Sequence, residues 1–305
     1  MFISVILSIA LSAYPTARIP ENIMASPPSS DRAFRGARHL APIPDADRPA
    51  LQQNDIAYGP DSLQRLDISL VAGRTPETPL IILIHGGGWM AGDKTACKPF
   101  LDFFNGHGCN TVNINYRLAN ATTIHYREIM KDIDKAVGYV VAHADKWSIR
   151  KKKIILWGGS AGGHLAMLYA YNYDKRNVVS SIISLGGPTK LDDRPSLAKS
   201  KKEDIEGLLP LITGKPWSND SLDLAYRLAS PWYGRHLKPS LVIHGEVDTI
   251  VSWLQARLMS DKLTSEGVDN QFFLIKNGWH GGEGASKETT DSLDITVNHW
   301  VQTHS

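Results

Sequence analysis

The sequence predicts an α/β fold in which a mostly parallel, doubly wound sheet carries helices on both faces. Short apolar runs of strand length alternate with amphipathic segments of helical periodicity along most of the chain. One of these runs, Leu80–Ile84, is apolar at every position, as expected of a strand buried on both faces. Ligands of such sheets bind beyond the carboxyl ends of the strands, so the residues that follow each strand are the candidates for a site.

About eight strands are expected, beginning with a hairpin. Residues 65–70 alternate apolar and polar side chains and are expected to pair with residues 55–58. The remaining strands are predicted at residues 80–84, 110–115, 153–156, 181–185, 241–243 and 272–275. Helices are predicted at residues 98–105, 124–144, 164–168 and 291–301, the second of them from apolar residues at helical spacing.

Composition indicates a folded globular protein. The 305 residues are 42% hydrophobic and 21% charged, and the net charge of +2 is too small to suggest binding to nucleic acid. The sequence has no phosphate-binding or dinucleotide-binding glycine motif and no zinc-like spacing of Cys and His, so we expect no cofactor and no metal. Cys97 and Cys109 either form one disulfide in an oxidising compartment or stay as two buried thiols.

The N-terminal region indicates export. Residues 1–17 combine a short apolar segment with small residues, which is typical of a signal peptide, although no basic residue precedes the apolar segment. An uncleaved anchor, a wrongly assigned start and a cytoplasmic location are the alternatives. Residues 18–50 are rich in Pro, Ser, Arg and Ala and are expected to form an arm or linker. One domain is expected over residues 51–305, with no stable membrane insertion after processing.

A serine between glycines is the most informative feature of the chain. The apolar run that ends at Leu156 is followed by WGGSAGG, with Ser160 at its centre, and then by a helical run from His164. Glycines two positions before and after the serine permit a sharp turn from strand to helix that exposes the hydroxyl. The free amides of the helix N-terminus would stabilise an oxyanion beside it. Taken alone, the motif is also compatible with an ordinary turn.

Polar clusters follow three other predicted strands. The segments are His85–Trp89 (HGGGW), His244–Asp248 (HGEVD) and Lys276–Gly282 (KNGWHGG). Because the carboxyl ends of parallel strands meet at one edge of the sheet, a serine, an aspartate and a histidine are expected to lie together there.

The chemistry of a serine nucleophile accounts for this grouping. The Ser160 hydroxyl needs an adjacent imidazole, here His280, to take its proton, and a carboxylate, Asp248, to fix the tautomer of that imidazole. The oxyanion that develops during the reaction also needs preorganised donors. The backbone amides expected to supply them are those of Gly87, Gly88 and Ala161.

With these motifs, and with residues 115–118 (NYRL), the chain resembles α/β-hydrolases of the esterase and lipase kind over about residues 51–303. It is most similar to hormone-sensitive-lipase-like carboxylesterases and to the bacterial feruloyl-esterase-like and kynurenine-formamidase-like groups. The resemblance implies an α/β-hydrolase fold, with Ser160 as nucleophile, His280 as general base and Asp248 as its orienting acid. It implies that the three amides form an oxyanion hole.

The acid and the base each have a competing interpretation. Asp248 could serve only as a loop cap, which would leave Glu246 as the neighbouring carboxylate. His280 could be an ordinary surface histidine, but His299 and His304 are poorer candidates because they lie on the closing helix and tail.

The two residues at the ends of His85–Trp89, called here the glycine-rich segment, are expected to have other roles. His85 is expected to orient the oxyanion segment, and Trp89 either lines the acyl pocket or packs beneath the loop. These two are the candidates for substrate contact. Asp132 is expected to be structural, and residues 115–117 are expected to pack beneath the site.

Residues 186–240 form a connection longer than is usual between a helix and a strand, and they are rich in Pro, Trp and Tyr. We expect this insertion, with the arm at 18–50, to form a small lid or pocket wall lined by aromatic residues. Replacing residues 192–220 should then alter the preference for acyl chains.

The sequence therefore favours a serine hydrolase that cleaves carboxylic esters of small or aromatic acids through an acyl-enzyme. An amide hydrolase of the arylformamidase type is the alternative within the same fold. A binding protein of this fold that has lost its chemistry is disfavoured, because both the serine and the histidine are present.

Overall fold

The computed structural model describes residues 48–200 and 202–305. The expected signal peptide at residues 1–17 lies outside the described residues, as does the arm at 18–50 except for its last three residues. The two expectations for these segments therefore stay predictions. Within the described ranges, no helix combines the length and the apolar character needed to span a membrane.

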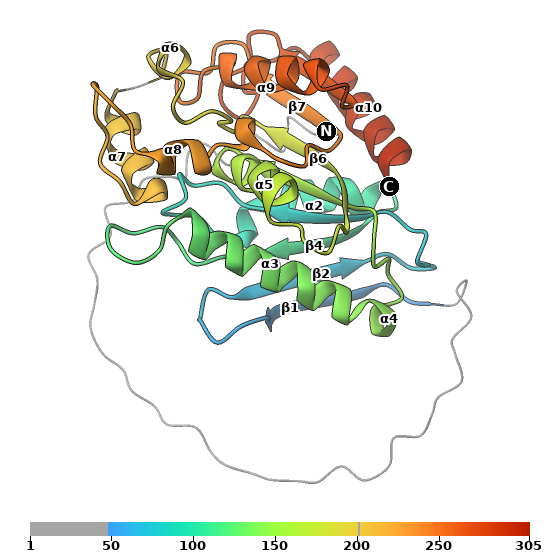
Figure 1. Cartoon of the computed structure of the whole chain (residues 1–305). Coiled ribbons are helices and arrows are strands. Elements are labelled where there is room, and N and C mark those ends of the chain that lie inside the picture. The colour runs from blue at the N-terminus through green and yellow to red at the C-terminus, as the bar shows by residue number, and fades with distance from the viewer. Residues whose placement is uncertain (1–47, 201) are drawn as a thin grey trace.

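The centre of the molecule is an eight-stranded sheet in the order β1-β2-β4-β3-β5-β6-β7-β8 (Figure 1). β1 pairs antiparallel with β2, and β2 pairs antiparallel with β4, while all later neighbours are parallel. The predicted fold class, a mostly parallel sheet of about eight strands, is confirmed. The strands are β1 (Leu51–Ala57), β2 (Arg65–Leu70), β3 (Leu80–Ile84), β4 (Asn110–Ile114), β5 (Ile154–Gly159), β6 (Val179–Leu185), β7 (Ser240–Gly245) and β8 (Asn270–Ile275).

Most elements lie where apolar periodicity predicts them. The exceptions in the main body include the first strand, which starts earlier than predicted, and α9 (Leu254–Ser265), which is not predicted. β1 begins at Leu51, four residues before the predicted start, because its side chains are polar and mostly exposed at the edge of the sheet. Its place is set by pairing with β2, interrupted by an irregularity between Gln53 and Ile56. The helices of the main body are η2 (Lys94–Cys97), α2 (Lys98–Gly106), α3 (Tyr126–Ala142), α4 (Ala144–Trp147), α5 (Ala161–Asn172), α9 (Leu254–Ser265) and α10 (Lys287–His304).

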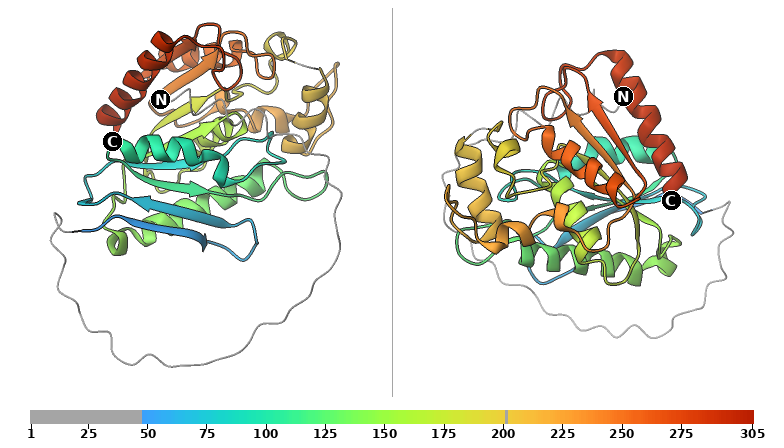
Figure 2. Two further views of the ribbon diagram at one scale, coloured as in Figure 1. Left: turned by 180° about the vertical axis from the view of Figure 1, so that it is seen from behind. Right: turned by 45° about the horizontal axis from the view of Figure 1, so that its top comes forward.

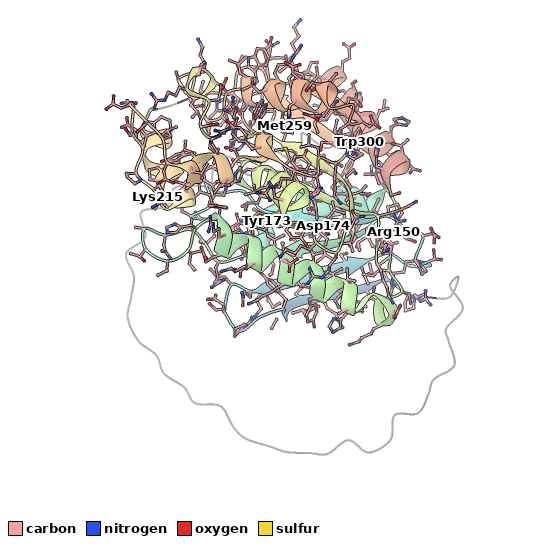
Figure 3. The ribbon with its side chains drawn as sticks, viewed as in Figure 1. Arg150, Tyr173, Asp174, Lys215, Met259 and Trp300 are labelled. Carbon is pink, nitrogen blue, oxygen red and sulfur yellow. The ribbon has the colours of Figure 1, made fainter. Side chains whose placement is uncertain are left out.

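Helices cover both faces of the sheet and enclose two apolar clusters. On one face of the sheet, α3, α5 and α9 pack on every second strand residue, such as Ile82. On the other face, α2 and α10 pack on the strand residues that point the opposite way, such as Ile81. Figure 2 shows α2 and α10 on the near face when the molecule is seen from behind. Met259 of α9 and Trp300 of α10, labelled in Figure 3, belong to the two different clusters. The strands between them are therefore buried on both faces, as predicted for Leu80–Ile84.

The long connection between β6 and β7 folds into short helices that lie together at one side of the sheet (Figure 1). Its aromatic residues pack in pairs, Trp217 against Tyr226 and Trp232 against Tyr233. The side-chain amide of Gln255 on α9 bonds the backbone at Thr189 and Lys190, which fixes the start of this insertion. Its elements are α6 (Arg194–Leu197), α7 (Lys202–Thr213), α8 (Leu224–Leu228) and η3 (Pro231–Tyr233).

The two cysteines are buried as free thiols. Cys97 ends η2 and Cys109 precedes β4, and both belong to the cluster under α2. Burial raises the pKa of the Cys109 thiol to about 11 and raises that of Cys97 as well, so both stay protonated. The structure thus agrees with the second of the two interpretations, a pair of buried thiols.

One buried histidine, His164, joins α5 to two other parts of the chain. Its Nδ1 accepts a hydrogen bond from the Trp89 indole at 3.1 Å, and its Nε2 donates to the Ala229 carbonyl at 2.7 Å. Both contacts are made by a neutral ring, and burial lowers the pKa of His164 to about 4.

The close approach of α5 to β3 gives a first prediction. A Cβ at Gly162 would overlap the Ile84 carbonyl oxygen and lie 2.7 Å from that of His85. Gly162→Ala is therefore expected to lower the free energy of unfolding by about 1–3 kcal/mol, measured by urea denaturation. The control is Gly207→Ala on α7, where no atom lies within 4 Å of the new methyl group. That variant is expected to be neutral or stabilising by up to about 1 kcal/mol. Equal effects of the two changes would contradict the close packing.

The buried imidazole gives a second prediction, about acid sensitivity. The folded pKa of His164 lies below its ordinary value, so on acidification below about pH 6.5 the unfolded chain takes up a proton that the folded protein excludes. The free energy of unfolding therefore falls with falling pH, by up to about 1.4 kcal/mol per pH unit from this residue. His164→Gln should be less stable at pH 7 but should lose less stability between pH 6.5 and 5. Urea titrations at several pH values measure both, and an unchanged slope in the variant would refute the assignment.

Candidate active site

Ser160 lies at a sharp turn between β5 and α5. Its backbone has φ 53° and ψ −124°, a conformation that a residue with a side chain rarely adopts. The turn is this tight because a Cβ on Gly158 would overlap the backbone of Gly162, and a Cβ on Gly162 would overlap the Ile84 carbonyl. The Ser160 amide donates to the Leu185 carbonyl at 2.7 Å, which ties the turn to β6. The strand, turn and helix expected around this serine are therefore present in the structure.

The structure brings Ser160, His280 and Asp248 into one chain of hydrogen bonds. His280, in the loop after β8, has its Nε2 2.9 Å from the Ser160 Oγ and its Nδ1 2.7 Å from the Asp248 Oδ2. A carboxylate can only accept, so Nδ1 carries the proton and Nε2 is free to accept the serine proton. This is the arrangement in which a serine hydroxyl can be activated as a nucleophile.

The Asp248 carboxylate is buried and held on all sides. Its Oδ1 accepts from the amides of Ile250 and Val251, at 2.8 and 3.0 Å. Its Oδ2 accepts from His280 and lies 3.0 Å from the Nε2 of a second histidine, His244. Burial by itself would raise the pKa of Asp248, but the hydrogen bonds from His244 and His280 hold it below its usual range. The carboxylate is therefore ionised and fixed in direction.

The competing residues lie elsewhere. Glu246 directs its Oε2 to the Asn277 amide at 3.0 Å, away from His280. His299 is exposed on α10. His304 stacks on Trp300, and its Nε2 lies 3.0 Å from the Asp269 Oδ2. Of the candidates weighed from the sequence, only Asp248 and His280 lie beside Ser160.

The glycine-rich segment after β3 lies against the Ser160 turn. A Cβ at Gly86 would lie 3.3 Å from the Cβ of Ser160. Gly87 and Gly88 have φ of +103° and +57°, which turns their peptide groups in a way that favours glycine. The amides of Gly87, Gly88 and Ala161 have no acceptor within the described part of the chain. The turn at Ser160 and the adjoining glycine-rich segment thus carry three backbone donors without an acceptor among the described residues.

His85 and Trp89, the two candidates for substrate contact, are buried under the glycine-rich segment. The His85 ring stacks on Tyr116 at 4.3 Å and donates from Nδ1 to the Gly86 carbonyl, and burial lowers its pKa to about 4. Trp89 is 4% exposed and donates to His164. Both side chains support the loop from below, and neither has the exposure that direct contact with a substrate would need.

The expectations for residues 115–117 and for Asp132 match their positions. Tyr116 lies under His85 and donates to its carbonyl at 3.0 Å. Asp132 is fully buried and accepts hydrogen bonds from the Arg117 guanidinium and the Gln64 amide. These groups hold α3 to the strands and lie away from the serine hydroxyl.

The sequence motifs assign no role to two histidines, His164 and His244, that contact residues of the site. His164 contacts Trp89, and His244 contacts Asp248. Each carried a signal in the sequence. His164 lies in the otherwise apolar first half of α5, where a polar side chain needs a partner. His244 ends an otherwise apolar strand, where a polar side chain needs a partner.

A leucine of the insertion, Leu208, contacts the glycine-rich segment. A Cβ at Gly88 would lie 3.2 Å from the Leu208 Cδ2, so this half-buried side chain of α7 covers the Cα of Gly88. Beside Asp248, a surface cavity of about 430 Å³ is lined in part by Lys199, Val247 and Trp253. Residues 48–200 and 202–305 contain no group of three or more His, Cys, Asp or Glu arranged to hold a metal ion.

Comparisons with known proteins identify a family and several relatives named as esterases. The model of the BD-FAE family matches residues 66–263. Esterase LipC and esterase LipQ of Mycobacterium tuberculosis (strain ATCC 25618 / H37Rv) are 26% and 27% identical to the chain over 245 and 252 residues. These alignments cover 74% and 76% of this chain. They span 59% and 58% of the two relatives, so the chain matches under two thirds of their length.

Solved structures of similar fold include a truncated carbohydrate esterase from gut microbiota, with a TM-score of 0.70 and 18% identity. That likeness covers 86% of this chain and 99% of the other. Esterase B from Lactobacillus rhamnosis (HN001) has a TM-score of 0.65 and 19% identity, covering 84% and 87%. At such low identity the structural likenesses support the α/β-hydrolase fold alone. The sequence match is more specific, since it covers well over half of the chain from β2 to α9, and by it the chain belongs to the BD-FAE family.

Proposed function

We propose that the protein is a serine carboxylic-ester hydrolase that works through an acyl-enzyme. The observation that carries the proposal is the hydrogen-bonded series Ser160–His280–Asp248. It is supported by three backbone amides of the adjoining turn and glycine-rich segment that have no acceptor among the described residues. The relatives named as esterases support the choice of ester over other acyl compounds.

In the first half of the reaction, the Ser160 Oγ attacks the ester carbonyl carbon while the His280 Nε2 takes the serine proton. Asp248 stabilises the imidazolium that forms and keeps the ring in place. The carbonyl oxygen becomes an oxyanion, which the amides of Gly87, Gly88 and Ala161 stabilise. His280 then gives its proton to the departing alkoxide, and the alcohol leaves an acyl group on Ser160.

The second half repeats these roles with water. His280 takes a proton from a water molecule as its oxygen attacks the acyl carbon, and the same amides hold the second oxyanion. When the tetrahedral intermediate collapses, His280 returns a proton to the Ser160 oxygen and the carboxylic acid leaves. The enzyme ends in its starting protonation state.

The proposal extends to small or aromatic acyl groups. Its support is the position of α7, which carries Leu208 onto Gly88 and so narrows the space above the expected oxyanion hole. The name of one structural neighbour, a carbohydrate esterase, is compatible with a sugar as the alcohol. Export of the protein, proposed from residues 1–17, rests on the sequence of that segment.

The proposed nucleophile can be tested by active-site labelling. A fluorophosphonate probe should label the wild-type protein, and Ser160→Ala should abolish labelling and lower kcat for short nitrophenyl esters by about 10⁴-fold or more. Ser292→Ala, an exposed serine on α10, is the matched control and should behave as wild type. A folded wild-type protein that is not labelled would refute the proposal. Faster hydrolysis of formylkynurenine than of nitrophenyl and feruloyl esters would show an arylformamidase instead.

The contact of the insertion with Gly88 gives a prediction about specificity. Leu208→Ala should raise kcat/KM for longer acyl chains relative to acetyl, and Leu208→Trp should lower it, each by about tenfold, since single-methylene differences in pockets have effects of this size. Leu224→Ala, on α8 of the same insertion and 62% exposed, should leave the ratio unchanged. The measurement is kcat/KM over a series of nitrophenyl esters. If neither Leu208 variant changes the ratio, α7 does not form the acyl wall.

A further inference from the structure

The proposed catalytic acid lies between two histidines. His244 is the fifth residue of β7 and is fully buried. Its Nε2 lies 2.7 Å from the Val251 carbonyl oxygen and 3.0 Å from the Asp248 Oδ2. The same Oδ2 accepts from the His280 Nδ1 at 2.7 Å. One carboxylate oxygen is thus shared between the base that faces Ser160 and a second imidazole behind it.

The surroundings of His244 fix its tautomer. Both groups near Nε2, an ionised carboxylate and a carbonyl, can only accept, so Nε2 must carry a proton. Its Nδ1 is buried and has no hydrogen-bond partner among the described residues. A proton on Nδ1 would be a buried donor without an acceptor, which is costly. A neutral ring with its proton on Nε2 therefore matches the surroundings of both ring nitrogens.

We propose, on the basis of the proposed function, that His244 is a positioning residue for catalysis: its Nε2–H holds the Asp248 Oδ2 in the direction that His280 needs. The Oδ1 is already held by two backbone amides of the following turn. The Nε2 proton of His244 is shared between the Val251 carbonyl at 2.7 Å and the Asp248 Oδ2 at 3.0 Å. Its attraction for the second oxygen opposes rotation of the carboxylate away from His280. Within the described residues, the titratable side chains in contact with the Asp248 carboxylate are His244 and His280, and both nitrogens lie on its Oδ2.

The hydrogen bond from the His244 Nε2 to the Val251 carbonyl keeps the imidazole ring in place. The loop after β7 turns back at Asp248 and brings the Val251 carbonyl over the strand end, next to the His244 ring. His244 consequently contacts both the start and the end of the loop that carries the acid. Removing the ring would affect loop stability as well as Asp248, so a useful test must separate the two effects.

Two amide variants of different length separate them. In Gln the side-chain amide nitrogen reaches about as far as the imidazole Nε2, whereas in Asn it reaches only about as far as Nδ1. His244→Gln should keep kcat for a short nitrophenyl ester within about threefold of wild type. His244→Asn and His244→Met should lower kcat by about ten- to hundredfold with little change in KM, the loss expected for a hydrogen bond to a charged group.

The pH profile supplies a readout that a purely structural role would not change. Without the His244 donor, more of the negative charge of Asp248 acts on His280 and favours its protonated form. The acidic limb of kcat/KM should therefore move to higher pH in His244→Met and stay near its wild-type position in His244→Gln. Folding of each variant is checked by its urea midpoint, and the comparison is made on the folded proteins.

A measurement on the wild-type protein covers the case in which the Met and Asn variants do not fold. Long-range ¹H–¹⁵N spectra of the imidazole rings report the protonated nitrogen of each histidine. At pH 7 we expect the His244 resonance, assigned by its absence from His244→Gln, to show a neutral ring protonated at Nε2. A ring protonated at Nδ1 or at both nitrogens would overturn the proposal.

The remaining outcomes are equally decisive. Folded His244→Met with wild-type kcat and pH profile would overturn the positioning role, as would equal losses in the Gln and Asn variants. If Ser160→Ala is inactive in the same assays, either of these results would leave the proposed function unaffected. A wild-type protein that hydrolyses no ester would instead refute the proposed function, while the tautomer of His244 would still be measurable.

Discussion

The packing of α5 against the ends of β3 and β5 is the constraint on which the rest of the site depends. Gly162 approaches the Ile84 carbonyl more closely than any residue with a Cβ could, and Gly158 meets the first turn of the helix from the other side. This approach forces Ser160 into its positive φ and directs its hydroxyl out of the turn. It also brings the free amide of Ala161 beside the glycine-rich segment after β3. One steric condition therefore positions both the hydroxyl and a donor for the charge that its attack would create.

Buried neutral histidines support the loops around this turn. His85 lies under the glycine-rich segment, His164 holds Trp89 at the end of that segment, and His244 contacts Asp248. A neutral imidazole has one donor and one acceptor on a rigid ring, so it can hold loop groups in place without a buried charge. Burial lowers the pKa of His85 and of His164 to about 4, which keeps both rings neutral near pH 7. The cost is sensitivity to acid, because each of these two rings would have to take up a proton without a new partner.

The sequence predicts the parts of the fold that depend on local pattern. Leu80–Ile84 is apolar throughout and forms β3 with these bounds, and the order of the motifs after the strands indicates that Ser160, Asp248 and His280 lie together. The start of β1 is not predictable in this way, because its exposed polar residues carry no apolar period and only pairing with β2 defines it.

Long-range contacts were likewise not predictable from the sequence. The pairing of His244 with Asp248, and of His164 with Trp89, depends on loops that turn back onto strand ends. No property of either residue alone determines these pairs. The aromatic density of residues 186–240 suggested an aromatic pocket wall, yet Trp217, Tyr226, Trp232 and Tyr233 pack in pairs. The contact with the glycine-rich segment is made by Leu208.

The residues proposed for the chemistry and the residue proposed to select the acyl group belong to different parts of the fold. The serine, histidine and aspartate are attached to strand ends whose positions are fixed by the sheet and by two buried apolar clusters. Leu208 belongs to α7 of the insertion and lies against Gly88. A change in α7 can therefore alter the space above the proposed oxyanion donors without moving the hydrogen bonds among Ser160, His280 and Asp248. A change at His244 would do the opposite, since it contacts the acid and lies behind it, away from the serine. The structure thus separates the residues that would select an acyl group from those that would set the rate of its transfer.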